Sequence, residues 1–171
     1  MNKKLVTFLM LLLLFFSFIL DGQISTLVTN WSIGLFAFSS FTLFMLAIFF
    51  VNFVSLRISL IFFSLLGFFY DVSYFGLIGI GTTIFPIVIF SMYFFFQGIK
   101  RNLFVDLIIL IISIFQFELI SFLFARIFHM TNLSFFIFVF NKLLPTMLFN
   151  FFLFIILYPM IKSFFEITNK T

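Results

Sequence analysis

Residues 103–125, LFVDLIILIISIFQFELISFLFA, decide the fold class of this chain. The stretch is longer than the roughly 20 apolar residues that an α-helix needs to cross a ~30 Å hydrocarbon core. Its charged residues are Asp106, near the start, and Glu118, further along. We therefore expect a membrane-spanning helix here, and the same test can be applied to the rest of the chain.

The composition of the whole chain agrees with a membrane protein. Hydrophobic residues make up 65% of the 171 residues and charged residues only 8%, whereas an ordinary soluble domain carries about 25% charged residues. So few charges could not cover a water-soluble globule, which excludes a soluble enzyme and a disordered tail. The absence of cysteine excludes a disulfide scaffold.

Further apolar stretches, separated by polar or charged breaks, predict additional spans. We expect six in total, at about 5–20, 31–54, 57–71, 76–97, 103–125 and 143–161. The first has the positive start of a signal peptide but no small-residue cleavage site before Asp21, so we expect it to be retained. Residues 133–140 are apolar but too short to span, and we expect them to form a lid or an interfacial turn.

The placement of Lys and Arg predicts the orientation of the spans. With a cytoplasmic N-terminus, the inner side holds most of the nine basic residues: Lys3, Lys4, Arg57, Lys100, Arg101, Lys162 and Lys170. The outer side holds Arg126 and Lys142. The sequence therefore predicts an all-α integral membrane protein, in which residues 1–171 form a single transmembrane domain. This domain is a compact bundle of six transmembrane helices with both termini cytoplasmic. The longest basic runs are pairs, so no nucleic acid partner is expected.

Ionisable residues inside the spans are the first candidates for function, because a charge in lipid is costly. Asp106 lies within reach of Lys100 and Arg101. Glu118 lies deeper, where it either bonds to a neighbouring helix or is protonated, acts on a substrate or proton, or contacts a partner. On the outer side, the following residues form either a charge cluster or independent solvated helix ends: Asp21, Asp71, Arg126, His129 and Lys142.

Small and polar residues in two other spans are candidates for packing or partner contact. Gly76 and Gly79, with Gly81, open the fourth span, where they either let helices approach closely or line a ligand site in a broken helix. Pro145 is tolerated near the start of the last helix, because its missing N–H would be unpaired there. An amide in lipid needs a partner, so Asn150 predicts a polar contact within the chain or with another protein.

The sequence offers no recognisable catalytic or metal-binding chemistry. It contains one histidine and no cysteine, and it has no HExxH, GxSxG or P-loop pattern. We therefore expect no metal site, no cofactor and no enzymatic activity.

Four motifs resemble the family of rod shape-determining protein MreD. They are Phe18–Gln23, Gly67–Asp71 followed by Tyr74–Gly79, Lys100–Asn102, and Lys142, Pro145 and Asn150 followed by Tyr158–Pro159. The resemblance covers almost the whole chain, and Asp71 and Asn150 match recurrent family positions. It implies a bundle resembling the substrate-binding subunits of energy-coupling-factor transporters.

The resemblance also implies a function. A member of this family is a multi-pass protein of the bacterial plasma membrane, and it acts as a non-enzymatic scaffold in the elongasome, which determines cell shape through peptidoglycan synthesis. The implied partner within the lipid bilayer is MreC, with MreB, RodA and a peptidoglycan transpeptidase as indirect partners. The alternative is the substrate-binding membrane subunit of an energy-coupling-factor vitamin transporter. Such a subunit should show an outward-facing pocket with polar and aromatic side chains.

Overall fold

Six continuous helical segments make up the regular structure of the residues described in this computed structural model, which are 3–33, 35–96, 98–99 and 101–169. The segments are α1 (Lys3–Trp31), α2 (Thr42–Phe50), α3 (Leu56–Tyr70) running into the π-helical turn η1 (Asp71–Phe75), α4 (Ile80–Phe96), α5 (Leu103–Ile127), and α6 (Phe135–Phe138) running through η2 (Val139–Leu143) into α7 (Leu144–Asn169). The prediction of an all-helical protein with six helices is confirmed.

The helices differ in their capacity to cross a membrane. Among the described residues, four stretches are long and apolar enough: Phe8–Trp31, Leu56–Tyr74, Leu103–Ile127 and Phe135–Phe165. The apolar part of α4, Ile80–Phe94, is shorter. At 1.5 Å per residue, the nine residues of α2 cover only about 14 Å, which is less than half of a ~30 Å hydrocarbon core.

The first helix is longer than the sequence predicts. We expected it to end at Leu20, but α1 continues to Trp31. Asp21, Ser25 and Thr29 follow one another in steps of four, so they share one face of the helix. Because all three side chains find hydrogen-bond partners within the chain, they do not need to leave the apolar region, and the helix continues through them.

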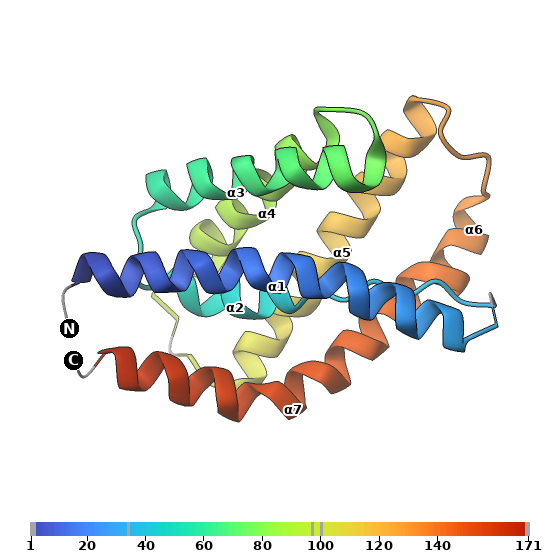
Figure 1. Ribbon diagram of the computed structural model, residues 1–171. Coiled ribbons are helices and arrows are strands. Elements are labelled where there is room, and N and C mark those ends of the chain that lie inside the picture. Colours follow the sequence, from blue (N-terminus) through green and yellow to red (C-terminus); the bar gives the residue numbers. More distant parts are fainter. Residues whose placement is uncertain (1–2, 34, 97, 100, 170–171) are drawn as a thin grey trace.

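The stretch predicted as the second span is not one helix. Trp31 ends α1, and residues 37–41 form a non-helical stretch, here called the return segment, that leads into the short α2. An extended chain advances ~3.3 Å per residue, about twice the rise of a helix. The return segment and α2 together bring the chain back beside α1, and the two termini lie at the same end of the molecule (Figure 1).

The last helix begins earlier than predicted. Residues 133–140, which we expected to form a lid or turn, contain α6 and the start of η2. The Ser134 hydroxyl accepts a hydrogen bond from the N–H of Ile137 at 3.3 Å and caps the helix. The Phe138 ring stacks on the Phe122 ring of α5 with 4.2 Å between centroids. This packing lets an apolar stretch that is too short to span alone become the first turns of a longer helix.

Helix α2 lies at the centre of the bundle. It contacts α1, α5 and α7, and Phe44, Met45, Ala47, Ile48 and Phe50 have no exposed surface. A helix that is apolar on all sides is typical of such a buried position. The N-terminal end of α2, where the return segment arrives, is therefore held inside the protein.

Helices α3 and α4 pack closely at two glycines. A Cβ atom added to Gly67 would lie 2.8 Å from the Cα of Thr82 and closer still to the carbonyl oxygen of Gly81, so this contact needs glycine. Gly76 and Gly79, predicted as packing residues, instead have open space around them and φ angles of 66° and 124° in the turn before α4. Their role in the fold is to allow a turn that other residues adopt only with strain.

Candidate functional site

The return segment is bound to its surroundings along its whole length. Every backbone N–H from Ala37 to Leu43 donates a hydrogen bond to α1 or to the last helix. The acceptors, in order, are the Asn141 carbonyl, Thr29 Oγ1, Thr146 Oγ1, Ser25 Oγ, Asn150 Oδ1, and Asp21 Oδ1 and Oδ2. Non-helical backbone at membrane depth is tolerated only where the protein satisfies its polar groups in this way.

Asp21 closes the N-terminal end of α2, although it belongs to α1. Its Oδ1 accepts hydrogen bonds from the N–H and the hydroxyl of Thr42, both at 2.7 Å, and from the hydroxyl of Ser40 at 2.8 Å. Its Oδ2 accepts from the N–H of Leu43 at 2.9 Å. A carboxylate satisfies the free N–H groups of a helix start and is favoured there by the helix dipole.

Asn150 binds the return segment from α7. Its Oδ1 accepts from the N–H of Phe41 at 2.9 Å, and its Nδ2 donates to the carbonyls of Ser39 at 2.7 Å and Thr146 at 2.8 Å. Asn150 and Thr146 have no exposed surface. The polar contact that the sequence predicts for Asn150 is thus made within the chain.

Pro145 occupies a different place from the one expected. Because the last helix begins at Phe135, Pro145 lies inside it and not near its start. A proline has no N–H and cannot bond to the carbonyl four residues earlier, here that of Asn141. The N–H of Ala37 donates to this freed carbonyl at 2.8 Å. Pro145 therefore leaves the Asn141 carbonyl free to accept a hydrogen bond from the return segment.

Asp71 is neither a solvated charge nor one member of an ion pair with Arg126. It is fully buried, and its carboxylate accepts hydrogen bonds from the N–H groups of Gly79, Gly81 and Thr82 and from the Thr82 hydroxyl. These groups surround the start of α4. Asp71 thus closes the N-terminal end of α4, as Asp21 closes that of α2.

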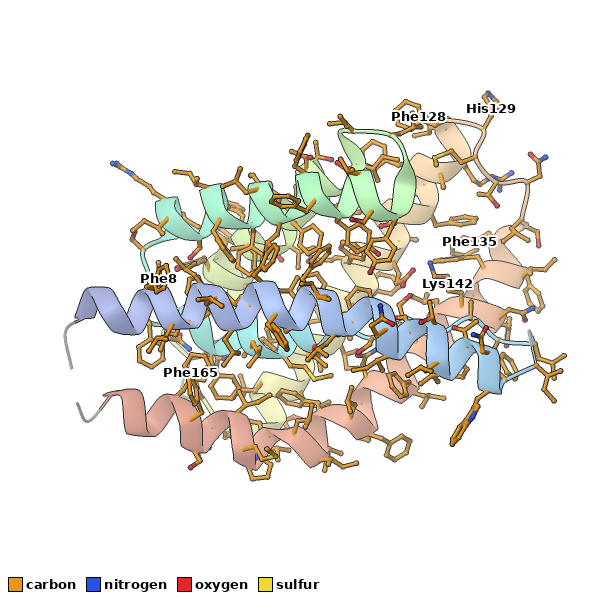
Figure 2. All side chains as sticks on the ribbon, viewed as in Figure 1. Phe8, Phe128, His129, Phe135, Lys142 and Phe165 are labelled. Carbon is orange, nitrogen blue, oxygen red and sulfur yellow. The ribbon has the colours of Figure 1, made fainter. Side chains whose placement is uncertain are left out.

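The charge cluster, one of the two alternatives for the outer side, does not form around the two aspartates, because both bind the starts of helices. Arg126 is exposed at the end of α5, and its guanidinium carbon lies 6.0 Å from the centroid of the Phe122 ring. His129 points away from the helices (Figure 2).

Glu118 forms an ion pair with Lys142 of η2, and 3.1 Å separates Oε2 from Nζ. The Glu118 side chain is 2% exposed and that of Lys142 is 42% exposed. Lys142 lies on the part of the last helix that faces α5 (Figure 2). Of the alternatives for Glu118, the structure therefore shows a bond to a neighbouring helix.

A cavity of about 420 Å³ lies between α1, the return segment, α5 and η2. Its walls include aromatic rings and polar groups: Phe41, Tyr70, Tyr74, Phe117, Glu118, Ser121 and Lys142. Ser121 is 7% exposed, and its hydroxyl oxygen is buried without a hydrogen-bond partner. A second hollow, of about 540 Å³, lies beyond the C-terminal end of α2 beside Asn52, Ser55 and Tyr93.

Sequence reasoning missed several residues of this site. Ser25 and Thr29 could have been found from their helical spacing to Asp21, but Ser121 gave no signal of its own. Asp106, in contrast, forms the expected ion pair with Arg101, and it also accepts a hydrogen bond from Tyr158. The hydrogen bond between Tyr158 and Asp106 connects the last helix with α5 near the other end of the bundle.

Among the residues that the structure describes, no three His, Asp or Glu side chains lie together as a metal site would require. A family model described as rod shape-determining protein MreD matches residues 2–168 of the chain. No curated protein and no solved structure that was compared matches it.

Proposed function

This chain belongs to the MreD family of rod shape-determining proteins, and on that premise we propose that it is a non-enzymatic membrane scaffold of the elongasome. Family membership gives the chain a role in shape determination. The finer proposal is that the chain binds MreC and positions peptidoglycan synthesis. The observation that carries it is the family match, which extends over residues 2–168 of 171.

The polar interactions of the bundle support a scaffold. Asp21, Asp71 and Asn150 each hold a helix end or the return segment in place. These residues are occupied within the fold, so they stabilise one arrangement of the helices. A rigid bundle of this kind can present a constant surface to a transmembrane helix of MreC, since helix association in lipid depends on close packing.

We further propose that the chain is a single transmembrane domain of the bacterial plasma membrane with both termini cytoplasmic. The termini lie at the same end of the molecule (Figure 1). Arg57 lies in the first turn of α3 and Arg101 just before α5, and Arg126 lies in the last turn of α5. MreB, RodA and a peptidoglycan transpeptidase are then indirect partners, reached through MreC.

The cavity favours a second candidate, the substrate-binding subunit of an energy-coupling-factor transporter. Such a subunit needs a pocket with polar and aromatic walls, and the cavity beside Tyr74 and Glu118 has both. The two candidates differ in their partners. A transporter subunit would be purified with a transporter ATPase, and a scaffold with MreC.

Co-purification from native membranes tests the scaffold. The full chain carries an affinity tag, and MreC from the same cells is expected in the eluate, whereas an unrelated polytopic membrane protein with the same tag retains none. Depletion of the chain should also change cell width and the pattern of peptidoglycan insertion. Absence of MreC together with unchanged width and insertion would reject the proposal, and recovery of a transporter ATPase would favour the second candidate.

A further inference from the structure

The cavity between α1 and α5 contains a polar group that the fold leaves unused. The hydroxyl oxygen of Ser121 is buried and has no hydrogen-bond partner, although a buried hydroxyl without a partner costs free energy. Ser113, two turns earlier on α5, is also buried, but its hydroxyl donates to the Ile109 carbonyl at 2.7 Å. The Ser113 hydroxyl, which does not line the cavity, therefore has a hydrogen-bond partner, whereas the Ser121 hydroxyl, which lines the cavity, has none.

The charges beside Ser121 indicate a ligand without net charge. Glu118 and Lys142 neutralise each other across the cavity wall. Asp21 also reaches the cavity, but both of its oxygens accept hydrogen bonds from the start of α2, where the helix dipole favours a negative group. A ligand with a net charge would have to bring a buried charge that has no counter-charge.

The remaining walls indicate a flat ring. Phe41, Tyr70 and Phe117 line the cavity together, and the Tyr70 and Phe117 rings meet edge to face with 5.4 Å between centroids. Aromatic walls of this kind favour a ligand ring that stacks or meets them edge to face. A volume of about 420 Å³ lies within the roughly 300–1,000 Å³ range of small-molecule sites.

We propose that this cavity binds a small net-neutral molecule that combines a flat apolar ring with a carbonyl or amide edge. The ring lies among the aromatic side chains, and the polar edge bonds to the Ser121 hydroxyl and to the Lys142 ammonium group. The site belongs to the chain itself, so this inference does not depend on MreC, and failure of MreC to co-purify would leave it untouched.

The chain contains no cysteine, so single cysteine variants report on the cavity directly. Full-length Ser121→Cys, purified in detergent, is treated with methyl methanethiosulfonate, a small neutral reagent. We expect its thiol to react at least tenfold faster than that of Ser113→Cys, which is the matched control on the same helix. Equal rates for the two variants would show that the cavity is closed and would overturn the proposal.

Benzamide, which is neutral, flat and carries an amide, then serves as the probe of ligand chemistry. We expect it to slow the modification of Ser121→Cys at least threefold and to leave the exposed Asn132→Cys unchanged. Benzoate and benzylamine have the same ring with a negative or a positive charge, and we expect weaker protection from both. No protection by benzamide, or equal protection by a charged analogue, would overturn the assignment.

Discussion

At the scale of single residues, two carboxylates, the partly buried Asp21 and the fully buried Asp71, act as caps for α2 and α4. The residue before α2 is Phe41, which makes no side-chain capping bond, and Asp21 supplies the acceptors from a neighbouring helix. Asp71 does the same for α4 across a turn of the chain. The cost of burying each carboxylate is offset by several charge-assisted hydrogen bonds.

Replacement of Asp71 by alanine should therefore destabilise the protein strongly. The N–H groups of Gly79, Gly81 and Thr82 would lose their acceptor in a buried place. We expect a loss of about 2–4 kcal/mol, from the ranges for a lost cap and for unsatisfied buried donors. Thermal unfolding of the purified variant in detergent measures it.

The control for this prediction is Thr83→Ala. Thr83 lies on α4, the helix that Asp71 caps, is exposed, and bonds to carbonyls of the preceding turn, so its replacement should change stability by less than about 0.5 kcal/mol. Equal unfolding temperatures for the Asp71 and Thr83 variants would contradict the capping role.

At the scale of elements, the last helix and the return segment are shaped for each other. The wide turn η2 and Pro145 interrupt the regular hydrogen bonding of the helix at the height where Ala37 arrives. One turn further, Thr146 and Asn150 bind Ser39 and Phe41. The irregular part of one element thus provides the partners that the other needs.

Replacement of Pro145 by alanine should loosen this junction. The new N–H can bond to the Asn141 carbonyl within the helix, and the N–H of Ala37 then loses its acceptor. Hydrogen exchange of the Ala37 amide should become about fivefold to tenfold faster, as expected for the loss of one net hydrogen bond. Amide exchange followed by NMR or mass spectrometry measures this change.

Pro159→Ala is the matched control, since Pro159 lies on the same helix outside the junction and is exposed. It should leave exchange at Ala37 unchanged. If both variants accelerate exchange at Ala37 equally, the effect comes from the helix as a whole, and Pro145 has no specific role at the junction.

At the scale of the whole molecule, the six helical segments of the described residues differ greatly in length. Within the part of the chain that the structure describes, four stretches have the length and hydropathy of a span. The short α2 and its return segment still reverse the direction of the chain, and the termini lie at the same end of the molecule (Figure 1). The topology that we propose therefore follows from the direction in which each segment runs. It does not require every segment to be long enough to cross the membrane by itself.

Cysteine labelling tests this topology, because the chain has no cysteine of its own. Arg57→Cys lies at the start of α3 and Asn132→Cys in the connection after α5, and both positions are exposed. In intact cells, a membrane-impermeant maleimide should label only Asn132→Cys, and after permeabilisation it should label both. Labelling of Arg57→Cys in intact cells would reverse or reject the proposed orientation.

Composition and hydropathy were sufficient to predict the helical class and the number of helices, because lipid admits few ways to satisfy a backbone. They also located α5 closely and placed Asp106 beside Arg101. The bounds of α1, α2 and the last helix could not be obtained in this way. They depend on where polar side chains bind backbone groups that are far away in the sequence: the Asp21 carboxylate accepts from the N–H of Leu43, and Asn150 Oδ1 accepts from the N–H of Phe41.

The order of apolar residues along the chain was enough to identify a helical protein with membrane-spanning stretches, and the motifs were enough to recognise its family. The three-dimensional fold was needed to see that Asp21, Asp71 and Asn150 serve as internal caps and bridges, that Glu118 pairs with Lys142, and that Ser121 faces a cavity. This difference arises because the free energy of a buried polar group depends on its partners in space, and the partners of these residues lie mainly on other segments of the chain.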